Sequence, residues 1–233
     1  MLFKSRRVQR RVLLATALCA GAVGVLLAAA QATGGGGNLA LPNVMTRNLY
    51  LGADLNPAIG AIQQCQGNPP AVPPLPPQQC QVLLLSTNQG IWNKVVATDF
   101  PARAKKLAKE IDDNDPYLVG LQEVALWRSA PADGTGPNAD TKVEYDFLAS
   151  LLSELSARGA KYKAAVIQQE ADIESPSAPP PFTTVTDRRL TMRDVILVRT
   201  DLPKALVSFT NPQSGNYCVS SCVGSPPRTI VLP

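Results

Sequence analysis

The chain has 233 residues, of which 45% are hydrophobic and 17% charged, a length and composition that suit one globular domain with a substantial core. It contains no histidine, which excludes catalytic systems with a histidine base and metal sites built on imidazole. The formal net charge is +4, but the positive excess lies at the N-terminus, so a broadly basic surface for nucleic acid is not predicted.

The N-terminus has the pattern of an export signal. Basic residues precede an uncharged apolar run over residues 12–30, and Ala30-Gln31-Ala32 matches the small-x-small rule for signal peptidase. We therefore predict a signal peptide at residues 1–32, a flexible leader at 33–42, and a protein that is secreted, periplasmic or at the cell surface. An uncleaved membrane anchor is the alternative, because the run approaches the roughly 20 residues that cross a bilayer.

The cysteines agree with export. Outside the signal the chain has Cys65, Cys80, Cys218 and Cys222, and an even number of cysteines in an exported chain favours disulfides. Local pairing predicts Cys65–Cys80 and Cys218–Cys222, although the other two connectivities remain open. A four-cysteine zinc site is the alternative, but the spacings do not form paired CxxC motifs.

Strand and helix patterns alternate along the rest of the chain. A helix over residues 99–111 has Asp99 as N-cap, Pro101 in its first turn and apolar residues at helical spacing. The alternation predicts a layered α/β fold. The predicted strands are 43–50, 118–124, 162–168 and 193–199, the second helix is 143–158, and proline-rich loops cover 66–79 and 176–181. Residues 209–233 have a loop pattern that ends in an apolar run, from which we expect a truncated domain over 43–233.

Two of these strands end in side chains that could bind a metal. Asn48 ends the first and Glu123 the second. Magnesium prefers carboxylate and amide oxygens and keeps several waters, so the pair predicts a magnesium site that could orient a phosphate. The alternative is a turn role for Asn48 and a solvated strand end for Glu123.

Three segments resemble the endonuclease/exonuclease/phosphatase superfamily. Thr46-Arg47-Asn48 is similar to its first-strand motif, Leu121-Gln122-Glu123 to its metal-binding LQE motif, and the segment 193–199 to its mid-domain strand. The resemblance covers roughly residues 43–210. It implies a partial two-sheet β-sandwich flanked by helices, corresponding to the N-terminal half of the superfamily fold.

The resemblance also implies roles for individual residues. Glu123 and Asn48 would bind Mg2+ or Mn2+, and Arg193 would contact phosphate as a catalytic residue, since a guanidinium suits that contact. A surface arginine paired with Asp187 or Asp194 is the alternative for Arg193. Other candidates near the site are Asp54, Tyr162 and Asp194, for which turn, core or solvent roles are the alternatives.

The implied activity is that of an exported, Mg2+-dependent phosphoester hydrolase acting on a nucleic acid, a phospholipid or a sugar phosphate. The family's Asp-x-Asn pair and terminal Asp-His pair do not follow the mid-domain strand, and one general base commonly contributes about 10²–10⁴-fold in rate. The alternatives are therefore a non-catalytic exported fragment and a disulfide-stapled binding module that uses its proline-rich loops.

Overall fold

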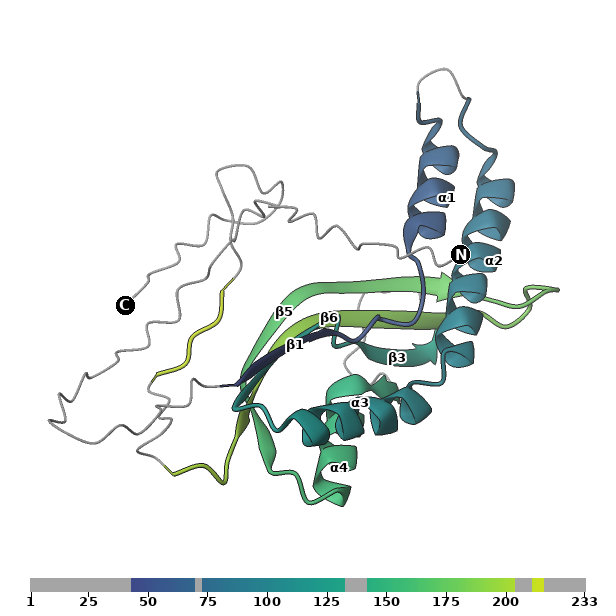
Figure 1. Ribbon diagram of the computed structural model, residues 1–233. Helices are drawn as coiled ribbons and strands as arrows, with labels where there is room; N and C mark the ends of the chain where they lie inside the picture. The colour runs from purple at the N-terminus through teal and green to yellow at the C-terminus, as the bar shows by residue number, and fades with distance from the viewer. Residues whose placement is uncertain (1–42, 70–72, 133–141, 204–210, 216–233) are drawn as a thin grey trace, which may run out of the picture. The chain divides into compact units, whose positions relative to one another are not determined.

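A six-stranded mixed sheet organises the protein (Figure 1). The computed structural model describes residues 43–69, 73–132, 142–203 and 211–215. The strand order is β1-β2-β6-β3-β4, and β5 also pairs with β6. β1 and β2 are parallel, and the other pairs are antiparallel. The strands are β1 Val44–Asn48, β2 Leu118–Gln122, β3 Leu126–Pro131, β4 Lys142–Asp146, β5 Tyr162–Ser177 and β6 Thr186–Arg199.

Four helices accompany the sheet in the described part of the chain: α1 Asn56–Gln66, α2 Pro77–Ala97, α3 Phe100–Asn114 and α4 Phe147–Ala157. In Figure 1, α3 and α4 lie next to each other on one side of the sheet. The rings of Phe100 and Phe147 stack between these helices with centroids 3.5 Å apart. Both are fully buried with Leu121 and Leu197 of the sheet, and burying a side chain of this size contributes about 1.5–3 kcal/mol.

Helix α3 confirms the predicted helix and its start. The Asp99 carboxylate accepts a hydrogen bond from the backbone N–H of Ala102, which satisfies one of the donors that a helix start leaves unpaired. The helix runs three residues past the predicted end, to Asn114, and Asp115 follows in the left-handed conformation.

The predicted helix 143–158 began too early. Residues 142–146 form β4, and α4 starts at Phe147, because the Asp146 carboxylate caps it by accepting from the N–H groups of Leu148 and Ala149. Val143 and Tyr145 are β-branched and aromatic residues, which favour a strand over a helix.

The four predicted strands are present as β1, β2, β5 and β6, but their lengths differ from the prediction. β5 and β6 pair antiparallel from Tyr162↔Arg199 to Ser177↔Thr186, so both extend far beyond the predicted 162–168 and 193–199. The interior of this ribbon is polar and charged, so no apolar run marks it. β2 ends at Gln122 instead of residue 124, because Glu123 takes a positive φ of 54°. β3 was not predicted.

The largest difference from the sequence prediction lies on either side of the proline-rich loop, where no helix was predicted and the structure has α1 and α2. The described residues between the helices, 67–69 and 73–76, are not helical, as predicted, and only residues 66 and 77–79 of the predicted loop belong to helices. Proline is compatible with the first turn of a helix, where the N–H groups have no intrahelical partner. Pro77 is the first residue of α2, and Pro57 is the second residue of α1. The predicted Cys65–Cys80 disulfide is confirmed and joins the two helices. We name α1, α2 and their connection the stapled hairpin.

The α/β class is confirmed, and the described residues form one sheet. They all belong to one compact unit, residues 39–228. Cys218 and Cys222, the predicted signal peptide and the predicted leader lie outside the described residues. None of the described helices has the length and apolar character needed to span a bilayer.

Candidate functional site

The two predicted metal ligands meet at the end of the parallel strand pair. β1 and β2 are in register from Val44↔Leu118 to Asn48↔Gln122, so Asn48 and Glu123 leave the sheet at the same edge. The Asn48 Nδ2 donates a hydrogen bond of 2.8 Å to Glu123 Oε1. The structure therefore brings together two side chains that lie 75 positions apart in the sequence.

The backbone next to this pair adopts the left-handed conformation at two residues. Tyr50 and Glu123 both have φ = 54°, a conformation that costs non-glycine residues about 1–3 kcal/mol and that clusters at functional sites. Asn48 Oδ1 accepts from the Tyr50 N–H at 2.7 Å, and Glu123 Oε2 accepts from the Leu51 N–H at 2.9 Å. The loop after β1 thus orients both polar side chains.

Two further side chains fix that loop. The Arg103 guanidinium on α3 donates to the carbonyl oxygens of Leu49 and Tyr50, and Leu49 is fully buried. The Trp127 indole Nε1 donates to Leu51 O at 2.9 Å in a buried position. Hydrogen bonds to the carbonyl oxygens of residues 49–51 therefore fix the backbone around the Leu51 N–H that binds Glu123.

A second carboxylate lies beside Glu123. Burial raises the pKa of the Asp194 carboxyl, a hydrogen bond with the Glu123 backbone lowers it, and the nearby charge of Glu123 raises it again. The pKa of Glu170 is also raised, first by burial and then by the charge of Asp194. Asp194 thus places a second acidic group beside Glu123, and Glu170 lies near Asp194.

The donor chemistry of this region fits a hard divalent cation. The side-chain donors are carboxylate and amide oxygens, as magnesium and manganese prefer, and magnesium is commonly held by one or two carboxylates with water completing its shell. The described residues contain no group of three or more His, Cys, Asp or Glu that could hold a metal by themselves. Any ion here would therefore retain much of its water.

Arg193, the predicted phosphate contact, makes structural contacts in this conformation. Its Nε donates to Val124 O at 3.0 Å and its Nη2 to Ala125 O at 3.3 Å. Nη2 also forms an ion pair of 2.7 Å with Asp146, the cap of α4. The side chain is only 11% exposed. Its partner is thus neither Asp187 nor Asp194, and the phosphate contact stays a prediction.

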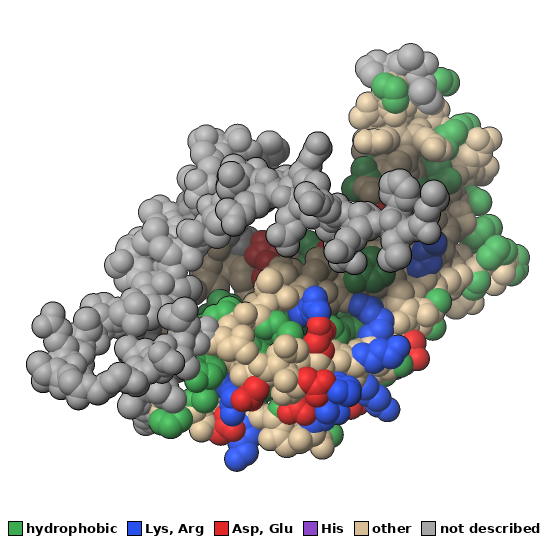
Figure 2. Space-filling view, in the orientation of Figure 1, with side chains coloured by type: hydrophobic (Ala, Val, Ile, Leu, Met, Phe, Trp, Pro, Cys, Tyr) green, Lys and Arg blue, Asp and Glu red, His purple; other side chains and the backbone are tan. Residues whose placement is uncertain are grey.

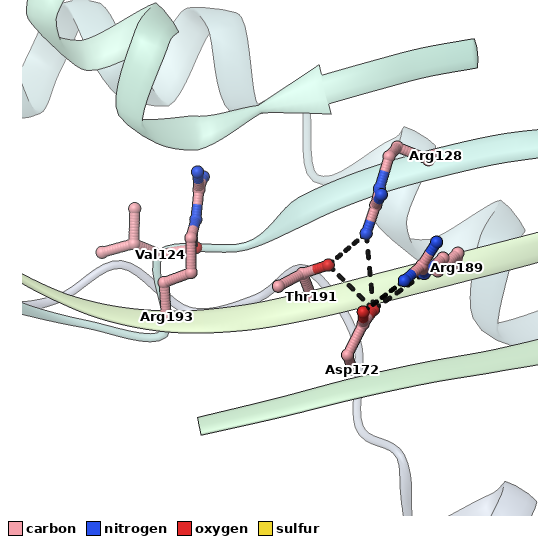
Figure 3. Close-up of polar contacts among 6 residues, drawn as sticks. All are labelled: Val124, Arg128, Asp172, Arg189, Thr191 and Arg193. Carbon is pink, nitrogen blue, oxygen red and sulfur yellow. Dashed lines mark hydrogen bonds and ion pairs between the residues drawn. The ribbon is translucent and has the colours of Figure 1, made fainter. Parts of the chain in front are cut away.

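A separate charged cluster surrounds Asp172 on β5 (Figure 3). The Asp172 carboxylate accepts from Arg189 Nε at 2.9 Å, from Thr191 Oγ1 at 2.9 Å and from Arg128 Nη2 at 3.3 Å. The hydrogen bond from Arg189 is the main cause that lowers the pKa of Asp172. Burial lowers the pKa of Arg128, whose Nε is buried without a hydrogen-bond partner among the described residues. We name Asp172, Arg128, Arg189 and Thr191 the Asp172 cluster.

The remaining candidates have local roles. Asp54 Oδ1 accepts from the Asn56 N–H at 2.9 Å where α1 begins, which is the turn role considered for it. The Tyr162 hydroxyl donates to Pro116 O at 2.7 Å, and burial raises the pKa of Tyr162 to about 12. Neither contact joins these side chains to Asn48 or Glu123.

Several residues of the site were not found from the sequence. Leu51 contributes its backbone N–H to Glu123, and Asp146 caps α4 and pairs with Arg193. No sequence motif marks either role. Asp194, by contrast, was a candidate from the sequence, and its carboxyl lies beside Glu123. Glu170 was hidden in a strand segment that was not predicted.

The surface around the helices carries charges of both signs. Figure 2 shows Lys and Arg side chains interspersed with Asp and Glu on this face. Ion pairs join Glu110 on α3 to Arg47 on β1, and Asp112 on α3 to Arg158 at the end of α4. An open hollow of about 440 Å³ and a smaller cavity of about 100 Å³ are lined largely by residues of the stapled hairpin and by the sheet beside it, and neither includes Asn48 or Glu123.

The comparisons with known proteins found no relative. No protein-family model, no curated protein and no solved structure matched the chain.

Proposed function

We propose that this protein is an exported, Mg2+-dependent phosphoester hydrolase of the endonuclease/exonuclease/phosphatase type. The observation that supports the proposal most strongly is the 2.8 Å contact between Asn48 and Glu123 at the shared edge of β1 and β2. The two motifs lie 75 positions apart in the sequence, and a chance resemblance would not require the fold to bring their polar ends together.

The proposed ion site consists of Glu123, Asn48 and Asp194. In the present conformation the Glu123 carboxylate is satisfied by an amide and a backbone N–H, while Asp194 adds a second negative charge nearby. Mg2+ or Mn2+ bound there would orient a phosphoester and stabilise negative charge on its oxygens. Glu123 would be the main ligand of the ion, and Asn48 would be its partner in the site.

The fold-level part of the proposal is a second sheet over the open face of the first. Val44 on β1 is 60% exposed and Ile167 on β5 is 48% exposed, and exposed β-branched residues on a sheet suit coverage by another layer. Arg193 supports the site by tying β6 to the chain that follows Glu123, and its contact with a bound phosphate is part of the proposal.

Several classes of substrate fit the proposal, namely a nucleic acid, a phospholipid head group or a sugar phosphate. The face shown in Figure 2 carries charges of both signs, so it offers no continuous basic surface to a polyanion. A nuclease that depends on broad phosphate attraction would show a basic surface, so the smaller phosphoesters are the better candidates.

The test is hydrolysis of bis-p-nitrophenyl phosphate by the purified full chain with Mg2+, compared between the wild type and Glu123→Gln. We expect the substitution to lower kcat by about 10²-fold or more, because it removes the charge that would hold the ion. Glu154→Gln on α4 is the matched control, and it should keep the wild-type rate. Mg2+ titration by calorimetry gives a second measurement.

Equal rates in the wild type and Glu123→Gln would contradict the site. If the wild type binds Mg2+ through Glu123 but hydrolyses no phosphoester, the ion site would stand and the hydrolase proposal would fail, which favours the non-catalytic alternative. Absence of both binding and hydrolysis would reject the proposal.

A further inference from the structure

A small cavity lies where the stapled hairpin meets the sheet. Its volume is about 100 Å³. One face of three paired strands forms its floor: Trp127 on β3, Leu190 on β6 and Ile173 on β5 lie opposite one another, and Arg188 lies opposite Ser175 two residues along the same face. The pairing of β3, β5 and β6 therefore fixes the floor of the cavity.

The stapled hairpin forms the other wall. α2 contributes Asn88, Ile91 and Trp92, whose spacing places them on one face of the helix, and the start of α1 contributes Leu55 and Ala58. Most of the lining is thus aliphatic or indole. Among the described residues that line the cavity, the one charged side chain comes from the floor.

That side chain, Arg188, lacks hydrogen-bond acceptors. It is only 16% exposed, and its Nε is buried without a hydrogen-bond partner. No hydrogen bond joins its side chain to another described residue, and its ion pair with Glu144 has an Nη1–oxygen distance of 3.8 Å, which is too long for a hydrogen bond. A guanidinium has five donors, and leaving such donors out of water without an acceptor is unfavourable.

The neighbours of Arg188 hold it in place without satisfying it. Its guanidinium carbon lies 4.1 Å from the centroid of the Trp92 ring, a cation–π contact that orients the planar group. The Glu144 carboxylate accepts hydrogen bonds from Ser129 Oγ and, at 3.2 Å, from Lys142 Nζ, so it is engaged elsewhere. The cavity therefore contains an oriented guanidinium beside an apolar space.

We infer that this cavity binds a small organic monocarboxylate with an apolar body. A carboxylate matches the planar fork of the Arg188 guanidinium, and the aliphatic and indole side chains would enclose the apolar body of the ligand. The volume is well below the roughly 300 Å³ or more of pockets for drug-sized ligands, so the ligand is small. With one guanidinium in the lining and Glu144 close to it, a single negative charge is favoured over the two of a phosphate group.

The cavity is separate from the candidate ion site. Asn48, Glu123 and Asp194 are not among its lining residues, and carboxylate binding needs neither a metal nor hydrolysis. The experiment below is therefore carried out in EDTA, so that its outcome does not depend on the proposed hydrolase.

The test is a titration of the full chain followed by intrinsic fluorescence. The chain has two tryptophans, and both Trp92 and Trp127 line the cavity, so the signal comes from the site itself. Cyclohexanecarboxylate should give a saturable change with a Kd of about 1 mM or lower. Cyclohexanecarboxamide, which has the same body without the charge, should bind about tenfold or more weakly, and inorganic phosphate should give no saturable change.

Two variants locate the binding. Arg188→Gln should weaken carboxylate binding by about tenfold or more and leave the affinity for the carboxamide unchanged, a difference that general damage to the fold would not produce. Ala58→Leu should abolish binding of both compounds by filling the cavity. The matched controls are Arg158→Gln, at an ion pair on α3 and α4, and Ala149→Leu, at an exposed position of α4, and both should bind as the wild type does.

Four results would overturn the proposal. These are no saturable change in the wild type up to about 10 mM carboxylate, equal affinity for the carboxylate and the carboxamide, an Arg188→Gln variant that binds the carboxylate as the wild type does, and phosphate binding as tight as carboxylate binding. Circular dichroism checks that each variant is folded. The comparison of the three compounds on the wild type keeps the test decisive if a variant does not fold.

Discussion

Two carboxylates, Glu123 and Asp172, have opposite surroundings. Asp172 accepts hydrogen bonds from two arginines and a threonine, and these contacts lower its pKa. Glu123 accepts from one amide and one backbone N–H, forms no ion pair within the described residues, and has the Asp194 carboxylate beside it.

The difference separates a structural acid from a candidate ligand. A carboxylate whose charge is already balanced by guanidinium groups has little to gain from a cation, and its loss removes the counter-charge that partly buried arginines share. A carboxylate held by neutral donors next to another acid retains its charge for a cation. The positive φ of Glu123 is a further cost that packing alone does not explain.

The largest effect on stability is expected at Asp172. Asp172→Asn should lower the free energy of unfolding by about 2–3 kcal/mol, because Arg128 and Arg189, which are 16% and 15% exposed, would lose their shared counter-charge. Urea unfolding of the full chain measures this difference. Asp201→Asn is the control, since the Arg199–Asp201 pair is more exposed and should contribute less than about 1 kcal/mol.

The effect of Asp172 should depend on pH with a defined sign. Its folded-state pKa is lowered, so its contribution is present above the unfolded-state pKa of about 3.9 and is lost as the pH falls through the folded-state value. The stability gap between the wild type and Asp172→Asn should therefore narrow below about pH 4. A gap that stays constant down to pH 2 would mean that packing, and not charge, holds the cluster.

Local signals in the sequence predicted the parts of the fold that depend on local chemistry. The cap of α3 at Asp99, the paired ends of β1 and β2, and the Cys65–Cys80 disulfide each follow from residues close in sequence or from a motif. The two helices of the stapled hairpin were not predicted because they lack charges and strong amphipathic patterning, whereas the prolines between them do mark a loop.

The site was predicted in part for the same reason. Asn48 and Glu123 stand at the ends of short strands, where a motif marks them. The features that complete the site depend on tertiary structure: the Leu51 N–H is placed by Arg103 and Trp127, and Asp194 is placed by the pairing of β6 with β2. Arg193 lies in a strand, as its motif predicted. Its contacts could not be predicted from the motif, because they depend on Asp146, which the fold brings to it from the end of β4.

A smaller effect on stability is expected at Arg193, which has one ion pair and otherwise contacts neutral carbonyl groups. Arg193→Lys should lower the free energy of unfolding by about 1–2 kcal/mol, because a lysine has no planar fork to bridge Val124 O, Ala125 O and Asp146 together. Arg158→Lys, at the more exposed pair with Asp112, is the control and should change stability less. If hydrolysis is detected, a rise in KM beyond the effect of the stability loss would place Arg193 at the phosphate.

The smallest effect on stability, and the one that tests the comparison most directly, is expected at Glu123 itself. Without added metal, Glu123→Gln should change the free energy of unfolding by less than about 1 kcal/mol, or raise it, because the substitution removes repulsion from Asp194 while an amide oxygen can still accept a hydrogen bond. Mg2+ at ten times its Kd should stabilise the wild type by about 1.4 kcal/mol and leave the variant unchanged. Thermal unfolding with and without Mg2+ measures both. A loss of several kcal/mol in the metal-free variant would make Glu123 a structural acid like Asp172, since an acid reserved for a cation contributes little to the fold until the cation is bound.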